Sequence, residues 1–220
     1  MKKTDSNETL QVSEVYSSIQ GESNYAGWPC VFVRLTGCPL RCRWCDTAYA
    51  FKGGEKMPLE VIMQKVRDFN MGMVELTGGE PLAQDAAPRL IEKLIAEKYK
   101  VLIETSGAED ISVLPVETHI VMDLKCPDSG MMQHNRYENI KCLKTSDEIK
   151  FVCASRNDFI WACDTIKKYK LDELCYLSFS PAWGHVQPKD LVAWLLESGI
   201  TARLNLQQHK YIWGPRAKSV

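Results

Sequence analysis

Short runs of apolar residues recur along the chain at intervals that suit alternating strands and helices. Several of these runs are nearly continuous in apolar residues, which is typical of parallel strands that are buried on both faces. The pattern predicts strands over residues 30–36, 73–77, 100–105, 119–124, 148–153, 174–179 and 202–206.

Longer segments between these runs have the spacing of amphipathic helices. The segment 58–69 opens with Pro58 near its first turn and carries Val61, Ile62, Val66 and Phe69 on one side. The other predicted helices cover residues 87–98, 156–169 and 188–199, and Gly199 supplies a C-terminal stop for the last.

The alternation of strands and helices predicts βα units around a parallel sheet. Six or seven units in 220 residues are too few for a complete eightfold barrel, which typically needs about 250 residues. We therefore expect a single α/β domain with a partial, open (β/α)6-type TIM barrel. A flavodoxin-like open sheet is the alternative.

Composition and charge narrow the class of protein. Hydrophobic content of 45% and charged content of 25% are those of a soluble globular protein. The formal net charge of −1 gives no global field that would favour nucleic acid or a membrane surface. No apolar run approaches the roughly 18 residues of a membrane span, and the N-terminus lacks the apolar core of a secretory signal. We expect a cytoplasmic protein.

The chain has nine cysteines, an odd number that does not suit a secreted disulfide framework. Cys153, Cys163 and Cys175 sit among apolar neighbours and are expected to pack in or near the core. In a reducing compartment the remaining cysteines suggest metal or cluster ligands and buried thiols.

Three of these cysteines, Cys38, Cys42 and Cys45, are closely spaced in the stretch "CPLRCRWC", directly after a predicted strand. A structural zinc site would need a fourth ligand. Cys30 or Cys126 could supply it, but neither belongs to a second Cys-x-x-Cys pair. Three thiolates would also hold a four-iron cluster by three corners and leave one iron open for another ligand.

The spacing C-x3-C-x2-C after a first strand resembles the signature of the radical S-adenosylmethionine (SAM) enzymes. This resemblance implies a [4Fe-4S] cluster on the three cysteines, with SAM chelating the free iron. One electron then cleaves the sulfonium and releases a 5′-deoxyadenosyl radical.

A second stretch, "LTGGEPL" (residues 76–82), follows the next predicted strand and agrees with that resemblance. By itself a Gly-Gly-Glu turn is more often a plain βα connection. Ser106, in "ETSG", and Asp123, in "MDLK", end later strands and could equally be a helix cap and a solvated strand end. The resemblance implies a SAM site made by Trp44, Cys45, Asp46, Gly79, Glu80, Ser106, Asp123, Leu124 and Lys125.

More specific features are "YSSIQGES" (16–23), the "CDT" that ends the cysteine loop, and "RLNLQQHKYIWG" (203–214). Together they resemble the 7-carboxy-7-deazaguanine synthases of queuosine biosynthesis. The resemblance implies a lyase that converts 6-carboxy-5,6,7,8-tetrahydropterin to 7-carboxy-7-deazaguanine with loss of ammonia. It also implies assistance by Mg²⁺, a homodimer, and a flavodoxin or ferredoxin as electron donor.

The same resemblance assigns substrate and magnesium residues. Ile19, Gln20 and Gly21 would contact the pterin, and Thr77 would contact the substrate. Arg34 would hold the substrate carboxylate, a task that suits a guanidinium. Its alternative is a strand-end ion pair, although an arginine in "VFVRLT" is badly placed in an apolar strand. Thr47 would bind Mg²⁺ through its hydroxyl, although such a threonine is usually a cap or turn residue.

Two rival functions share part of this pattern. A glycyl-radical activating enzyme would use the same cysteine loop but would act on a protein, without a need for Arg34 or the "SIQGE" segment. A structural zinc or iron–sulfur module would leave "TGGEP" and "ETSG" unexplained. We expect a disordered segment at 1–10, a radical SAM core domain at 11–213 and a C-terminal tail at 214–220.

Overall fold

One curved sheet organises residues 8–220, the part of the chain that the computed structural model describes. Its strand order is β3-β1-β2-β4-β5-β6-β7-β8-β9. β1 runs antiparallel to β2 and β3, and every later pairing is parallel. The strands are β1 (Thr9–Ile19), β2 (Pro29–Leu35), β3 (Glu55–Pro58), β4 (Met73–Gly78), β5 (Lys100–Thr105), β6 (His119–Asp123), β7 (Glu148–Cys153), β8 (Tyr176–Pro181) and β9 (Arg203–Leu204).

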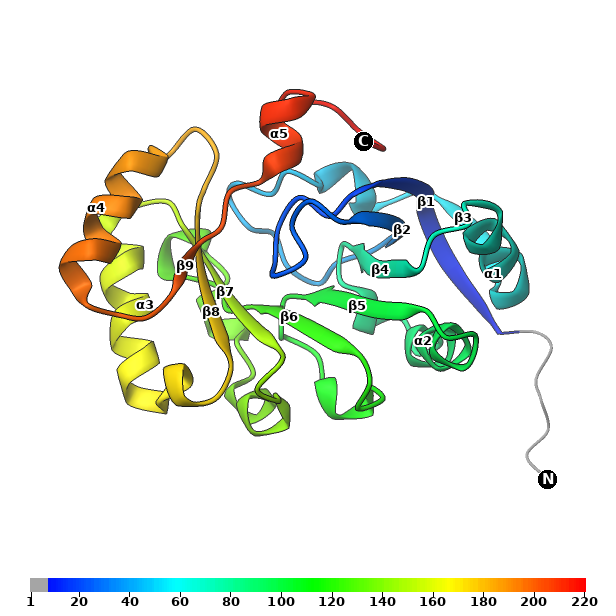
Figure 1. The fold of residues 1–220 in the computed structure, drawn as a ribbon, viewed down its shortest axis with the longest axis horizontal. Coiled ribbons are helices and arrows are strands. Elements are labelled where there is room, and N and C mark those ends of the chain that lie inside the picture. The colour runs from blue at the N-terminus through cyan, green and yellow to red at the C-terminus, as the bar shows by residue number, and fades with distance from the viewer. Residues whose placement is uncertain (1–7) are drawn as a thin grey trace.

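Four longer helices lie around the outside of this sheet, and a short fifth helix lies apart from them beside the C-terminus (Figure 1). They are α1 (Leu59–Asp68), α2 (Ala87–Ala96), α3 (Arg156–Tyr169), α4 (Pro188–Ser198) and α5 (Gln208–Ile212). Short 3-10 helices cover Ala48–Phe51, Pro81–Ala83, Ile111–Val113, Pro127–Ser129, Met132–His134, Tyr137–Cys142 and Leu171–Glu173.

The parallel strands follow one another in chain order, which is the order of a barrel. A flavodoxin-like sheet would reverse its strand order at a switch point and carry helices on both faces. In residues 8–220 the edge strands β3 and β9 are not paired with each other, so the barrel is open. The predicted partial, open barrel is therefore confirmed against its alternative.

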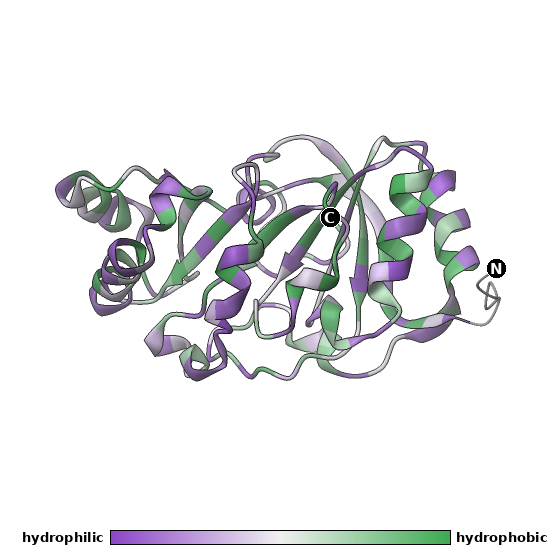
Figure 2. Ribbon diagram, turned by 90° about the horizontal axis from the view of Figure 1, so that it is seen from below, coloured by the Kyte–Doolittle hydropathy of each residue, from purple (hydrophilic) through white to green (hydrophobic). Residues whose placement is uncertain are grey.

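The main core lies between the outer face of the sheet and the helices. On β4, Val74 and Leu76 face outward into it, and Leu90, Ile91 and Leu94 of α2 are fully buried there. The helices are accordingly amphipathic, and hydrophobic stretches follow the strands in Figure 2. The burial of Cys153 and Cys163 and the packing of Cys175 against this core agree with the prediction.

The inner face of the sheet is packed differently. A small cluster of Cys30, Phe32, Met73 and Leu102 forms an apolar floor inside the barrel. Beyond this floor, toward the carboxyl ends of the strands, the inward positions become polar. Side chains alternate along a strand, so outer core and inner pocket are built from neighbouring residues of the same strands.

Each predicted strand and helix is present, with small shifts at the ends. β8 begins at Tyr176 because Leu171–Glu173 forms a 3-10 helix first, and β9 is shorter than predicted. The prediction that Val61 lies on the buried side of α1 was wrong, because this residue is 44% exposed. The buried residues of α1 are Leu59, Ile62, Met63 and Val66.

Two strands, β1 and β3, were not predicted from the sequence. β1 carries a mostly polar sequence and β3 is only four residues long, so neither has the apolar run that marks the other strands. The predicted disordered segment at 1–10 also extends too far, because Thr9 lies in β1 and Leu10 is buried. The rest of that prediction, residues 1–7, lies outside the described residues.

The edge strand β9 is connected to the β1–β2 hairpin by a side chain. In β9, Arg203 donates from Nη2 to the Ser23 carbonyl at 2.6 Å, and its Nη1 contacts the Asn24 side chain. Ser23 and Asn24 belong to the hairpin between β1 and β2, so this hairpin is joined to β9 at one edge of the sheet. Within residues 8–220, the helices are too short or too polar to cross a membrane.

Candidate active site

A pocket of about 480 Å³ lies inside the barrel at the carboxyl ends of the parallel strands, where ligands bind in such folds. It contains residues from the β1–β2 hairpin, the loop after β2, the strand ends and the C-terminal segment. The predicted site residues that line it are Ile19, Gln20, Gly21, Arg34, Cys38, Cys42, Trp44, Cys45, Asp46, Thr47, Thr77, Gly79, Ser106, Asp123 and Lys125.

The three predicted cluster ligands lie on the loop after β2, and each is partly buried. The loop is held by hydrogen bonds within it: the Cys45 N–H donates to the Cys42 carbonyl at 3.2 Å, and the Arg41 side chain donates from Nη1 to the Cys38 carbonyl at 2.7 Å. Burial raises the pKa of the Cys42 thiol, and the Lys125 ammonium nearby opposes that shift.

The thiols fit a cluster better than a single ion. In residues 8–220, no three His, Cys, Asp or Glu side chains converge as ligands of one metal ion. In an iron–sulfur cluster each thiolate binds a different iron, so its cysteines need not meet at one point. The other zinc candidates, Cys30 and Cys126, are buried in the inner floor and the outer core.

Gly79 brings the "TGGEP" turn against the cysteine loop. A Cβ at this position would lie 2.0 Å from the Gly37 carbonyl oxygen, so only glycine allows this approach. The next residue, Glu80, donates from its N–H to the same Gly37 carbonyl at 2.8 Å. The two loops are therefore joined at the rim of the pocket.

The side chains of Glu80 and Leu124 do not line the pocket. The Glu80 carboxylate is fully buried and accepts hydrogen bonds from Thr105 Oγ1 (2.9 Å), Ser106 N (2.7 Å), Ser106 Oγ (2.5 Å) and Leu82 N (3.0 Å). It joins the turn after β4 to the turn after β5. Leu124 is fully buried in the outer core. Any contact of these two residues with a cofactor must therefore come from the backbone.

Asp123 and Lys125 place a charged pair at the end of β6. Lys125 Nζ lies 2.8 Å from Asp123 Oδ2. Burial lowers the pKa of Lys125, but the Asp123 carboxylate outweighs that effect and raises it above its usual value. The second oxygen, Asp123 Oδ1, is buried and has no hydrogen-bond partner within residues 8–220. A polar ligand in the pocket would satisfy it.

Arg34 reaches the pocket from β2 and is also ion-paired. Its Nε lies 2.6 Å from Glu14 Oε1, and its Nη2 donates to the Tyr16 hydroxyl at 2.9 Å. The structure thus contains the strand-end ion pair that the sequence offered as an alternative, and it also leaves the guanidinium on the pocket wall. On the neighbouring strand, Thr77 is paired with Arg34 in register and contacts Glu104 at 3.4 Å.

A buried ionic group that the sequence analysis missed lies deeper in the pocket. Lys150 Nζ, on β7, lies 2.9 Å from Glu22 Oε2 and 2.8 Å from Glu104 Oε1. Burial alone would raise the pKa of the Glu22 carboxyl, but the Lys150 ammonium lowers it below its usual value. For Glu104 burial prevails, so its pKa is raised.

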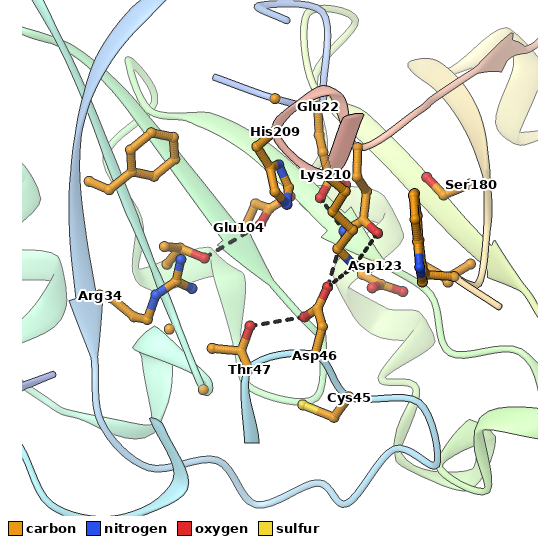
Figure 3. Close-up of a pocket in the computed structure, with 18 of the residues that line it drawn as sticks. Glu22, Arg34, Cys45, Asp46, Thr47, Glu104, Asp123, Ser180, His209 and Lys210 are labelled. Carbon is orange, nitrogen blue, oxygen red and sulfur yellow. Dashed lines mark hydrogen bonds and ion pairs between the residues drawn. The ribbon is translucent and has the colours of Figure 1, made fainter. Parts of the chain in front are cut away.

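Helix α5 closes one side of the pocket, and its residues meet those of the cysteine loop (Figure 3). Lys210 Nζ lies 2.5 Å from Asp46 Oδ2, and the Thr47 hydroxyl donates to Asp46 Oδ1 at 2.9 Å. The Asp46 side chain is partly exposed, and the Lys210 ammonium outweighs its partial desolvation and holds the pKa of Asp46 far below its usual range. The hydroxyl proton of Thr47 is directed at Asp46, which leaves its oxygen lone pairs available to a cation.

Gly21 allows α5 to approach. A Cβ on this residue would lie 2.4 Å from His209 Nδ1, and the Gly21 carbonyl accepts a hydrogen bond from Gln208 N at 2.9 Å. Burial lowers the pKa of His209, so its imidazole favours the neutral form. Gly21 was predicted to contact the pterin, and its close neighbour in the structure is His209.

The remaining wall is aromatic and C-terminal. The ring of Trp44 lies 5.8 Å from that of His185, after β8. The last residues of the chain also line the pocket, and Ser219 Oγ donates to Glu14 Oε2 at 2.5 Å. The carboxylate that pairs with Arg34 is thus covered by the C-terminal segment.

One feature of the sequence could have identified part of the buried ionic group around Lys150. Glu75, Glu104 and Lys150 each interrupt an apolar strand, as Arg34 does. A charged residue at an inward strand position is costly unless it is paired or used. His209 and Lys210 carry no such signal, because α5 is too short to show a periodic pattern.

Known proteins resemble nearly the whole chain. The 7-carboxy-7-deazaguanine synthase of Koribacter versatilis (strain Ellin345) is 44% identical over 96% of this chain and all of its own length. The synthase of Chlorobaculum tepidum is 41% identical over 96% of this chain and 97% of its own.

The domain model and the solved structures agree with these relatives. The model of the Radical SAM superfamily matches residues 32–119. The crystal structure of QueE from Escherichia coli has the same fold, with a TM-score of 0.70, 21% identity, and coverage of 91% of this chain and 95% of that one. This chain therefore belongs to the 7-carboxy-7-deazaguanine synthase family of radical SAM enzymes, which carry a [4Fe-4S] cluster and use SAM.

Proposed function

We propose that the chain catalyses the reaction for which its relatives are named, the formation of 7-carboxy-7-deazaguanine, from 6-carboxy-5,6,7,8-tetrahydropterin with loss of ammonia. The observation that carries this proposal is that Arg34 and the cysteine loop line one pocket of about 480 Å³. A guanidinium there suits a small anionic substrate next to the radical source.

Cys38, Cys42 and Cys45 would hold the cluster. When bound, the cluster and SAM supply the organic radical that starts the reaction. The chain would position SAM with Trp44, Asp46, Gly79, Ser106, Asp123 and Lys125, which line the pocket. The unpartnered Asp123 Oδ1 supports a polar cofactor at this wall. Glu80 would act by fixing the turns that carry Gly79 and Ser106.

The substrate would lie on the opposite wall. Arg34 would hold its carboxylate, with Thr77 beside it on β4. Ile19, Gln20 and Gly21 would contact the pterin ring from the β1–β2 hairpin. Thr47 would bind Mg²⁺ through its hydroxyl oxygen, and this role is supported by the hydrogen bond that turns the hydroxyl proton toward Asp46.

The partners are also proposals. A one-electron donor such as a flavodoxin or ferredoxin would reduce the cluster, and the working form would be a cytoplasmic homodimer. Residues 11–213 would form the catalytic domain, and the tail 214–220 would cover the substrate site. The contact between Ser219 and Glu14 supports that role for the tail.

The test is an anaerobic assay. The cluster is reconstituted, SAM and dithionite are added, and products are followed by mass spectrometry with and without 6-carboxytetrahydropterin. Formation of 7-carboxy-7-deazaguanine with little net loss of SAM supports the proposal. Cleavage of SAM without conversion of the pterin would contradict the proposed substrate. It would favour a protein substrate, as in a glycyl-radical activating enzyme.

A variant then tests the carboxylate site. Arg34→Met should raise the KM for the pterin by about ten- to hundredfold, because a hydrogen bond to a charged group contributes roughly 1.5–3 kcal/mol. Arg67→Met removes an equivalent guanidinium from the exposed surface of α1 and should leave the KM unchanged. An unchanged KM in Arg34→Met would remove Arg34 from the substrate site.

A further inference from the structure

Glu75 is a buried carboxyl that the proposed function does not yet use. It lies on the inner face of β4, between Met73 in the apolar floor and Thr77 at the proposed substrate carboxylate site. Its side chain is 1% exposed and lines the pocket. A carboxyl at such a position costs stability, so its presence requires either a structural or a ligand-binding explanation.

Within residues 8–220, the one side chain that hydrogen-bonds Glu75 is Gln20, whose Nε2 donates to Glu75 Oε2. The same amide accepts a hydrogen bond from Glu22 N through its Oε1, at 2.9 Å. The backbone of Gln20 is fixed as well, since its N–H donates to the Trp28 carbonyl at 2.7 Å. Gln20 is therefore held in one orientation, and it holds Glu75 through Oε2 in a position that lines the pocket.

The ionisation state of Glu75 follows from its surroundings. Burial, and next the Glu104 carboxyl, raise the pKa of Glu75 well above its usual value, while Lys150 and Arg34 oppose that shift. In a neutral carboxyl that accepts from Gln20 through Oε2, the other oxygen carries a hydrogen-bond donor, and Oε2 keeps a second lone pair as an acceptor beside it. That pair complements a neighbouring N–H and C=O, such as the lactam edge of a pyrimidinone ring.

The walls next to Glu75 suit a flat ring. Phe32 is the register partner of Glu75 on β2, and its ring stacks on Tyr16 with centroids 5.1 Å apart. Two residues further along these strands, Arg34 is the register partner of Thr77. Two residues of a strand span roughly 6.6 Å. That separation suits a fused bicyclic ring that carries its carboxylate at Arg34 and its far edge at Glu75.

We propose that Glu75 is a specificity-determining residue that hydrogen-bonds the N3–H and C4=O edge of the pterin, held in place by Gln20. This inference rests on the proposed function and deepens it. It explains why a carboxyl is kept in an otherwise apolar strand, directly above an apolar floor. It also gives Gln20 a supporting role besides any direct contact with the substrate.

The test measures binding and does not depend on turnover. The reconstituted enzyme, with SAM and without reductant, is titrated with the fluorescent and unreactive 6-carboxypterin. Glu75→Leu should weaken binding about tenfold or more, because it removes a buried hydrogen-bonding pair. Glu75→Gln keeps a donor and an acceptor and should bind within about threefold of the wild type.

A matched control is Val74→Ala, on the outer face of the same strand. It should lower stability without weakening pterin binding. Glu75→Leu with wild-type affinity, or Glu75→Gln as weak as Glu75→Leu, would overturn the inference. A wild-type enzyme that holds its cluster and SAM but binds no pterin would overturn the proposed function together with this inference.

A ligand modification tests the same contact if Glu75→Leu does not fold. The N3-methyl derivative of 6-carboxypterin lacks the N3–H donor and should bind the wild type about tenfold more weakly. The difference between the two pterins should shrink in Glu75→Ala, which leaves room for the methyl group. Equal affinity of the wild type for both ligands would overturn the inference.

Discussion

The two faces of the sheet are built from the same strands but in opposite ways. The outer face packs against the helices with almost entirely apolar side chains. The inner face has a four-residue apolar cluster and, beyond it, places Arg34, Glu75, Glu104 and Lys150 toward the pocket. On β4 the change occurs between adjacent residues, since Leu76 faces the helices and Glu75 faces the pocket.

This difference separates stability from function within one sheet. Each buried apolar side chain of the outer face stabilises the fold by roughly 1.5–3 kcal/mol. Buried carboxyls and ammonium groups stabilise little in net terms, because their desolvation offsets their attraction. The inner face therefore reduces stability in order to hold ligands, and the outer face compensates for it. Four changes would test this division, from the largest expected effect to the smallest.

The largest effect is expected at the mouth of the pocket. Cys42→Ala should abolish pterin conversion, because the two thiolates that remain would not hold the cluster. The free energy of unfolding of the cluster-free protein should change by less than about 1 kcal/mol, since Cys42 is only partly buried. Anaerobic product analysis and urea unfolding measure the two quantities. Residual turnover near the wild-type rate would contradict the cluster assignment.

The next effect concerns the outer face. Phe179 on β8 is fully buried, with ring centroids 5.4 Å from Phe151 and 4.9 Å from Phe159. Phe179→Ala should lower the free energy of unfolding by about 3–5 kcal/mol through the cavity that it leaves. The KM for the pterin should stay within about twofold of the wild type. A large rise in KM with unchanged stability would contradict the proposed separation of stability and function between the two faces of the sheet.

A third change probes the ionic group inside the barrel. Lys150→Met removes the cation that Glu22 and Glu104 share, and it should lower the free energy of unfolding by about 3 kcal/mol. Lys150→Met combined with Glu104→Gln should recover part of that loss, because fewer buried charges remain unpaired. Lys168→Met, on α3, changes the same residue type outside the pocket and should have little effect. The absence of any recovery would argue against coupling between Lys150 and Glu104.

The smallest effect is a pH dependence. The pKa of Glu75 is raised by burial, so the folded state keeps a proton that the unfolded state loses above about pH 4.5. The contribution of this group to stability is present below that pH and is lost as the pH rises toward the folded-state pKa. Between pH 5 and 8, Glu75→Gln should therefore lose less stability than the wild type, by on the order of 1 kcal/mol. Parallel curves for both proteins would indicate that Glu75 is ionised when folded.

The outer face is also the part that the sequence predicted best. Strands such as Glu148–Cys153 and helices such as Arg156–Tyr169 are marked by apolar periodicity, which reports burial directly. β1 and β3 carry no such mark, because their positions depend on pairing with β2 and with each other rather than on an apolar face. Pairing of that kind is a long-range property that local patterns do not contain.

The candidate site was predictable as far as its motifs extend. The motif-based predictions placed Cys38, Asp46 and Gly79 on one pocket, but Glu80 and Leu124 point away from it. Motifs identify positions and do not say which way a side chain faces. The contact between Asp46 and Lys210 joins residues 164 positions apart and has no local signal. Identifying such pairs requires the fold itself.

The Glu80 carboxylate accepts four hydrogen bonds, and these determine when the turns around the proposed SAM site become ordered. They join the turns after β4 and β5 through protein groups alone, so the fold itself orders the rim that would receive SAM. The conformational entropy of those turns is lost during folding, and binding need not supply it again. SAM would thus meet a receptor that already has its bound shape.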